Sequence, residues 1–154
     1  MHKTLKPMEE ATLLAYKAGS QGEIPIGAVI VRNGKIISKA YNKREKSQIA
    51  THHAEILAIQ KACKKLKSWR LDDCDLYVTL EPCPMCAGAI INARIKNVYY
   101  AVKDEPSGGI SRFNLLNNTL NHTTNSFHLT EYEQENKNLI QNFFKDKRKN
   151  TRNP

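Results

Sequence analysis

The stretch DLYVTLEPCPMCAGAI, residues 75–90, passes from a strand pattern into a helix pattern, with two cysteines at the junction. Residues 75–80 have the length and the aromatic and β-branched content of a strand. Pro84 suits the first turn of a helix, where its missing N–H costs no hydrogen bond. Cys83 and Cys86 are three residues apart at the start of this helix, so both thiols project from one face. The stretch therefore predicts a strand that delivers two cysteines to a single point.

The segments that precede this stretch also alternate between helix and strand patterns. Apolar residues recur at helical spacing within residues 8–19. Residues 24–31 are an apolar run of strand length, and the Asn33–Gly34 pair is a strong hairpin turn. Residues 35–42 then have the pattern of the returning strand. This part of the chain predicts a helix followed by an antiparallel hairpin.

The remaining elements point to a mixed sheet. A helix is predicted over residues 51–66, with Thr51 able to cap its N-terminus. After the cysteine stretch come a strand at 97–102 and a long polar helix at 130–149. Strand–helix–strand crossovers imply parallel pairing, whereas the hairpin is antiparallel. The pattern predicts an α/β fold, a three-layer sandwich around a mixed sheet.

The bulk composition is that of one folded domain. The chain has 154 residues, 40% of them hydrophobic and 25% charged. No segment approaches the roughly 20 consecutive apolar residues that a membrane-spanning helix needs. The first 19 residues lack the basic, apolar and small-residue order of a secretory signal. We therefore expect a cytoplasmic protein with no membrane partner, in which a disulfide between Cys83 and Cys86 is disfavoured.

Positive charge is concentrated near the end of the chain. The net charge is +9, which favours a polyanionic partner, with nucleic acid first. Phe143 and Phe144 can stack on bases while neighbouring cations meet phosphates: Lys145, Lys147 and Arg148. The alternative is that the charges are only solvated, and in either case we expect one phenylalanine to pack in the core. The segment predicts RNA contacts from the basic end.

Two cysteines do not complete a metal site, and the sequence HHAE, residues 52–55, supplies further candidates. His53 and Glu55 are two residues apart, which on a regular helix turns them about 200° from each other. They cannot point the same way unless the backbone is still turning at His53. Ligation by His53, Cys83 and Cys86 would leave the fourth position of a tetrahedral zinc open for water. Zinc lowers the pKa of such a water from about 15.7 to about 7, and Glu55 can accept its proton.

Other interpretations of the cysteine pair stay open at this level. A C-x-x-C motif is weak by itself, because redox pairs and structural zinc sites also use it. A structural site needs a fourth ligand, for which Cys63 and Cys74 are candidates, and His52 could replace His53. A redox pair has no need of a nearby His-x-Glu, and a purely structural site has no use for the carboxylate. The order H-x-E followed by P-C-x-x-C is the signature of zinc deaminases.

The two motifs and their flanks resemble the cytidine/adenosine deaminase superfamily, and within it the bacterial tRNA-specific adenosine deaminases. The zinc motifs are HAEILAI and LYVTLEPCPMCAGAI, and the phrase SWRL beside them narrows the resemblance to this branch. The resemblance covers nearly the whole chain. It implies a cytidine deaminase-like fold, an α/β/α sandwich with a five-stranded mixed sheet. We accordingly expect one zinc-dependent deaminase domain over residues 1–149 and a basic, disordered tail over 150–154.

The resemblance also implies an activity. It implies a homodimer with one zinc ion per subunit, held by His53, Cys83 and Cys86, and with Glu55 as the proton shuttle. The implied reaction is hydrolytic deamination of the wobble adenosine to inosine in a tRNA anticodon stem-loop. The tRNA would be one for arginine.

Further substrate contacts are carried over by matching positions. Asn42 matches the family position that hydrogen-bonds the flipped base, and Ala54 and Pro82 offer backbone groups nearby. The loop at 103–113, KDEPSGGISRF, departs from the family pattern through an extra acidic residue and through Ser-Arg-Phe in place of Gly-Ser. Asp104 is the expected acidic contact there. This difference in sequence affects the residues expected to bind the anticodon loop, whereas the zinc motifs are unchanged.

Two other functions compete with this one. The first is deamination of a free base or nucleotide, such as guanine or a cytosine derivative, on the same fold. The second is a catalytically silent, zinc-stabilised RNA-binding module, which Glu55 argues against. Ammonia release from tRNA, guanine or deoxycytidylate would separate all three.

Overall fold

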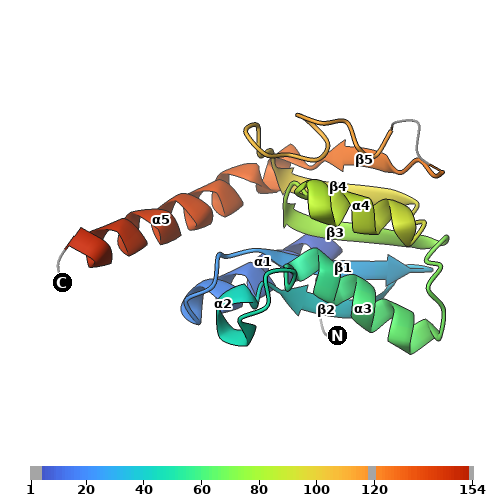
Figure 1. Ribbon diagram of the computed structural model, residues 1–154, viewed down its shortest axis with the longest axis horizontal. Coiled ribbons are helices and arrows are strands. Elements are labelled where there is room, and N and C mark those ends of the chain that lie inside the picture. The colour runs from blue at the N-terminus through green and yellow to red at the C-terminus, as the bar shows by residue number, and fades with distance from the viewer. Residues whose placement is uncertain (1–4, 118–120, 153–154) are drawn as a thin grey trace.

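The computed structural model describes residues 5–117 and 121–152. Its five strands form one mixed sheet in the order β2-β1-β3-β4-β5, with helices on both faces (Figure 1). The predicted α/β sandwich with a mixed five-stranded sheet is therefore confirmed. The elements are α1 (Pro7–Ser20), β1 (Gly27–Arg32), β2 (Lys35–Tyr41), α2 (Arg44–Ser47), α3 (Ala54–Leu66), β3 (Cys74–Leu80), α4 (Pro84–Asn92), β4 (Asn97–Val102), β5 (Asn125–His128), the 3₁₀ turn η1 (Thr130–Tyr132) and α5 (Glu133–Arg152).

Because of the strand directions, the segments that follow β2, β3 and β4 all leave the sheet at the same edge, the one formed by the C-terminal ends of these strands. β1 and β2 form the predicted antiparallel hairpin, whose turn residues Asn33 and Gly34 have φ of 52° and 75°, as a type I′ turn requires. β1 is antiparallel to β3, whereas β3 is parallel to β4 and β4 to β5. The chain therefore leaves β2, β3 and β4 at the same edge, where α3 and α4 also begin.

Both faces of β1 are buried, which explains its unbroken apolar sequence. Ala28 and Ile30 belong to the core that the sheet forms with α3 and α4. Val29 and Val31 pack on the opposite face, in a smaller cluster with Met8 of α1. The alternation of side chains along one strand thus fixes the sheet between two layers of helix.

The structure corrects two details of the expected elements. The helix predicted from residue 51 begins at Ala54, and its cap is His53 rather than Thr51. The short α2 and the edge strand β5 were missed by pattern alone, and only the family resemblance implied a fifth strand. β5 has the sequence NSFH and is mostly exposed, so it lacks the alternating apolar pattern that would reveal it.

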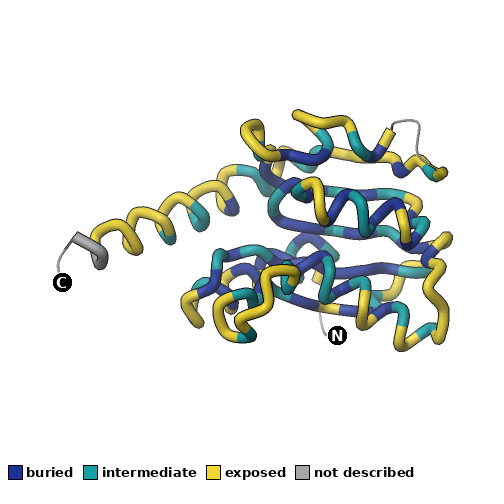
Figure 2. The backbone as a smooth tube through the Cα atoms, viewed as in Figure 1, coloured by how far each residue is buried: buried dark blue, intermediate teal, exposed yellow. Residues whose placement is uncertain are grey.

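The C-terminal helix departs from the body of the molecule. α5 begins beside β4 and then projects outward, with most of its length exposed (Figures 1 and 2). Phe143 is half-buried and Phe144 is 40% exposed, so the expectation that one of them packs in the core was wrong. α5 includes residues 150–152 of the predicted tail, and residues 153–154 lie outside the described residues. The helices of the described chain are too short or too polar to span a membrane.

Candidate metal centre and substrate pocket

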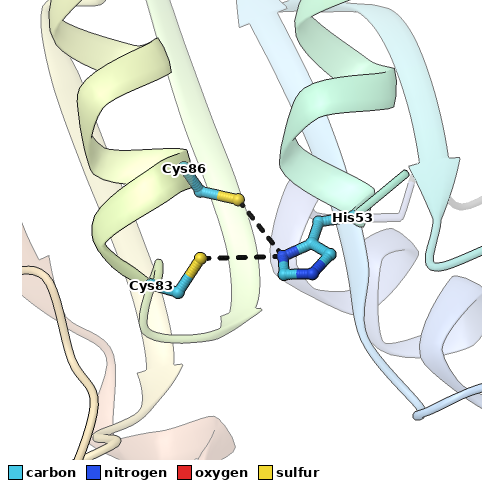
Figure 3. Close-up of side chains that lie close together, drawn as sticks. All are labelled: His53, Cys83 and Cys86. Carbon is cyan, nitrogen blue, oxygen red and sulfur yellow. Dashed lines mark hydrogen bonds between the residues drawn. The ribbon is translucent and has the colours of Figure 1, made fainter. Parts of the chain in front are cut away.

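Three side chains from two helix N-termini converge at this edge of the sheet. His53 is the N-cap of α3, Cys83 is the N-cap of α4, and Cys86 lies in the first turn of α4. The Nδ1 atom of His53 is 3.6 Å from the Cys83 Sγ and 3.5 Å from the Cys86 Sγ (Figure 3). The three candidate ligand atoms all lie within 4.8 Å of one another. The predicted ligands are thus brought together from segments 30 residues apart.

The backbone at His53 resolves the geometric conflict with Glu55. His53 has φ −77° and ψ 156°, an extended conformation, so it precedes the helix rather than belonging to it. Glu55 lies in the first turn of α3, where the helical spacing of about 100° per residue begins to apply. Both side chains therefore line the same pocket. Within the described residues the ligand group includes neither His52 nor the other two cysteines, Cys63 and Cys74.

Of the two thiols in the candidate ligand group, that of Cys83 is the more readily ionised. A hydrogen bond from the Cys86 thiol lowers the pKa of Cys83 to about 4, and a hydrogen bond from His53 and one from the Cys86 backbone N–H add to the effect. The same thiol contact raises the pKa of Cys86, and burial adds to it. The hydrogen bond with Cys83 raises the pKa of His53. The partial positive charge of a helix N-terminus favours this thiolate further.

The donor set fits a tetrahedral metal ion of intermediate softness. Zinc binds imidazole nitrogen at about 2.0–2.1 Å and thiolate sulfur at about 2.3 Å, so two such ligands at a tetrahedral angle are about 3.5–3.6 Å apart. The observed Nδ1–Sγ distances are 3.5 and 3.6 Å. Among the described residues the group contains three ligands, and none of the other His, Cys, Asp or Glu side chains completes it. An imidazole and two thiols in this arrangement form a metal site typical of zinc deaminases.

Glu55 is a buried acid beside this site. It is 4% exposed, and burial raises its pKa to about 7. The negative charge of Cys83 acts in the same direction, while His53 opposes it. A carboxyl group that titrates near neutral pH can both accept and return a proton. The arrangement therefore supplies a proton acceptor next to the candidate ligands.

A cavity of about 440 Å³ opens over the site. It is large enough for a small-molecule or nucleoside group. Of the substrate residues expected from the sequence, Asn42 and Asp104 line this cavity, and so does Phe144 of α5. Asn42 is buried, and its Oδ1 accepts a hydrogen bond from the Arg44 backbone N–H at 3.2 Å. Burial raises the pKa of Asp104.

The other expected contacts lie outside the cavity lining. Ala54 and Pro82 are buried next to the ligands in sequence, and the Pro82 carbonyl accepts a hydrogen bond from the Gly109 N–H at 2.8 Å. The remaining residues predicted to contact RNA are farther along α5 than Phe144 or on its other sides: Phe143, Lys145, Lys147 and Arg148. Their contacts with RNA stay predictions.

Three cations at the cavity were not expected from the sequence. Arg44 of α2, Lys103 after β4 and Lys137 of α5 all line it. They come from three separate segments, so no local motif could have found them. Arg44 follows Asn42 by two residues, and this nearness was the one available signal.

The sequence comparisons agree with this site. Residues 3–148 match the profile of the MafB19-like deaminase family. A tRNA-specific adenosine deaminase from Aquifex aeolicus is 45% identical over 139 residues, which cover 88% of this chain and 90% of that protein. The chain belongs to the tRNA-specific adenosine deaminase family. A relative with the same name from Bacillus subtilis is 54% identical over 104 residues, which cover 68% of this deaminase and 64% of the relative.

Solved structures show the same fold. A structure from a study of A-to-I editing by tRNA:A34 deaminases at the wobble position of transfer RNA matches with a TM-score of 0.83 and 39% identity, covering 86% of this deaminase and 97% of that chain. A guanine deaminase from Bacillus subtilis matches with a TM-score of 0.63 and 37% identity, covering 86% and 90%.

Proposed function

We propose that this deaminase uses zinc to convert the wobble adenosine of a tRNA anticodon to inosine. The observation that supports it is the convergence of His53, Cys83 and Cys86 on a pocket that also holds the buried acid Glu55. The products are inosine and ammonia, so one water is consumed for each amine released. The tRNA deaminase relatives make a tRNA adenosine the first substrate to test.

The residues of the chain have separate tasks in this reaction. His53, Cys83 and Cys86 would hold a zinc ion, which supplies a Lewis acid that makes water nucleophilic near pH 7. Glu55 takes a proton from the attacking water and delivers it to the ring nitrogen next to the carbon bearing the amine. It then takes the proton of the newly added hydroxyl group and gives it to the amine, which leaves as ammonia while the carbonyl forms. Proton transfer by a positioned group contributes about 10²–10⁴-fold to the rate, so electrostatic stabilisation supplies the remainder.

Substrate binding is assigned to the rest of the cavity. Asn42 would hydrogen-bond the base, and the backbone groups of Ala54 and Pro82, which lie beside the cavity lining, would contact the substrate or its leaving amine. Asp104 faces the substrate from the loop after β4. An adenosine within RNA must leave its stack to enter such a pocket, and an anticodon loop allows this at low cost.

The positive charge around the cavity favours RNA over a free base. Arg44, Lys103 and Lys137 line the cavity, and their charges suit the phosphates that flank a flipped nucleotide. Guanine or a cytosine base carries no phosphate for them to bind. The basic end of α5 would extend these contacts along the stem-loop, through Phe143, Phe144, Lys145, Lys147 and Arg148.

We also expect a homodimer acting in the cytoplasm. Met85 of α4 is 37% exposed and lies between the candidate ligands Cys83 and Cys86 in the sequence, so a second subunit that covered it would lie close to the pocket. Measurement of the molar mass in solution tests this expectation.

The decisive experiment is sequencing of arginine tRNA before and after treatment with the protein. An adenosine that becomes read as guanosine at the wobble position supports the proposal. Guanine and deoxycytidylate are offered in parallel, with ammonia release as the readout. Ammonia from guanine but unchanged tRNA would favour the free-base alternative suggested by the guanine deaminase structure.

A further inference from the structure

Glu81, the residue before the Pro-Cys of the metal motif, is a buried carboxylate that takes no direct part in the proposed chemistry. It is 1% exposed, and its backbone N–H donates to the Val102 carbonyl at 2.8 Å. This bond fixes it to the end of β4. A buried carboxylate is costly unless several donors satisfy it.

The donors to Glu81 all come from one loop. The backbone N–H groups of Asp104, Ile110 and Ser111 donate to its carboxylate at 3.2, 2.9 and 2.7 Å. The Ser111 hydroxyl also contacts both carboxylate oxygens, at 2.8 and 3.0 Å. The Glu81 side chain therefore binds both ends of the segment 104–111. This is the loop whose sequence departs from the family pattern, and Ser111 is part of that departure.

The Glu81 carboxylate packs directly against the backbone of Gly108. A Cβ added at Gly108 would collide with the Glu81 carboxylate and would lie 2.5 Å from the Asp104 carbonyl oxygen. The next residue, Gly109, donates its N–H to the Pro82 carbonyl at 2.8 Å. The loop is thus attached at two adjacent points, Glu81 and Pro82, to the segment that leads into Cys83.

The loop also forms part of the substrate cavity. Lys103 and Asp104 line it, and so does Glu81 itself. We propose that Glu81 is a positioning residue, which holds the loop 104–111 so that Asp104 faces the substrate at a fixed distance from the metal ligands. The inference rests on the proposed function and adds a second task for this segment, because the residue before the Pro-Cys of the metal motif orders the cavity wall.

A carboxylate is required because every partner is a donor. Glutamine has nearly the same shape, but it has one acceptor oxygen and an NH₂ group that would face backbone N–H groups. Glu81→Gln should therefore release the loop and leave the metal ligands in place. Ser111→Ala removes the hydroxyl contacts only and should have a smaller effect of the same kind. Thr124→Val is the matched control, since Thr124 is buried and donates to the Ile95 carbonyl at 2.7 Å, at the opposite edge of the sheet.

The first measurement is hydrogen exchange of the zinc-loaded protein. In Glu81→Gln the backbone amides of Asp104, Ile110 and Ser111 should exchange at least about 10-fold faster, with the zinc content unchanged. Thr124→Val should leave these amides as they are in the wild type. Wild-type exchange rates in Glu81→Gln, or loss of its zinc, would overturn the inference. This test needs no substrate, so it stands even if the proposed reaction fails.

The second measurement is a double-mutant cycle on kcat/KM for an anticodon stem-loop. Glu81→Gln should lower kcat/KM at least about 10-fold, mainly through KM, and Ser111→Ala should cost nothing further in that background. Additive losses, or a Glu81→Gln enzyme as active as Thr124→Val, would contradict a positioning role. If the wild type itself does not deaminate the stem-loop, the proposed function fails and the exchange result alone decides the inference.

Discussion

His53 and Cys83 occupy equivalent positions, because each is the N-cap of the helix that follows it. The N-termini of α3 and α4 lie close together, with the His53 Nδ1 3.6 Å from the Cys83 Sγ. Each helix contributes partial positive charge to the same point, which favours a thiolate and any anion bound there. The fold thus prepares the electrostatics of the site before a metal ion is bound.

Glu55→Ala should leave zinc bound and abolish turnover. Glu55 is absent from the ligand group, yet it is the buried acid that lines the pocket. We expect a loss of at least about 10²-fold in kcat, the lower limit for a positioned proton shuttle. The checks are zinc content and inosine formation in the same preparation. Near-normal activity would remove Glu55 from its assigned role.

Cys86→Ala should lose the metal. Two remaining ligands are fewer than the three that a catalytic zinc site uses, and the Cys83 thiolate would lose the hydrogen bond that most lowers its pKa. The expected result is less than about a tenth of the wild-type zinc after dialysis. Cys63→Ala is the control, because Cys63 lies outside the ligand group and should keep full zinc. Equal zinc in both variants would refute the ligand assignment.

The metal-free protein should show a pH dependence traceable to Glu55. Burial raises the pKa of Glu55 from 4.5 to about 7, so the folded state binds this proton more tightly than the unfolded state. The stabilisation is complete below about pH 4.5 and is lost as the pH rises through about 7, up to about 3 kcal/mol. Relative to Glu55→Gln, the wild type should therefore lose free energy of unfolding over this range. If the free energies of unfolding of the wild type and Glu55→Gln differed by the same amount at every pH, Glu55 would not be a buried acid with a raised pKa.

Gly27→Ala should destabilise the fold. A Cβ at Gly27 would collide with the Ala11 carbonyl and lie 2.8 Å from both the Ala15 nitrogen and the Leu14 Cβ, so α1 touches β1 at this point. Overpacking of this kind costs about 3 kcal/mol or more when backbone atoms must move. Gly88→Ala is the comparison, since an added Cβ there would have no neighbour within 4 Å beyond the adjoining residues and its own helix backbone, and alanine favours a helix. In denaturant unfolding, the free energy of unfolding should be lower than that of the wild type for Gly27→Ala and higher for Gly88→Ala.

The basic end of α5 should contribute salt-dependent affinity. Replacement of Lys145, Lys147 and Arg148 by glutamine should weaken binding of an anticodon stem-loop at low salt. The slope of log K against log salt should fall by about 0.7–0.9 for each phosphate that the variant no longer neutralises. Titrations at several salt concentrations measure this directly. An unchanged slope would show that these cations do not meet phosphates.

Much of the fold was predictable because its elements are local. The Asn33–Gly34 turn has the two positive φ values that its sequence predicts, and β4 begins and ends as expected. β5 was not predictable from pattern, since an exposed edge strand of four residues has no apolar period. The role of Gly27 was not predictable from pattern either, because it depends on the close packing of α1 against β1.

The ligand group was predictable because its motifs are short and chemically specific. His53, Cys83 and Cys86 were named from spacing and signature, and the structure brings them together. The alignment of His53 with Glu55 could not be predicted, because it depends on the extended backbone at the N-cap. The contacts of Glu81 were equally hidden, since they join a residue of one loop to donors 23 to 30 positions away.

The central claim is a zinc ion with one imidazole, two thiolates and one position left for water. X-ray absorption at the zinc edge of the purified protein tests it most directly. The account predicts one zinc per chain, with two sulfur neighbours at about 2.3 Å and two nitrogen or oxygen neighbours at about 2.0–2.1 Å. A third sulfur neighbour, or protein that contains no zinc, would contradict it.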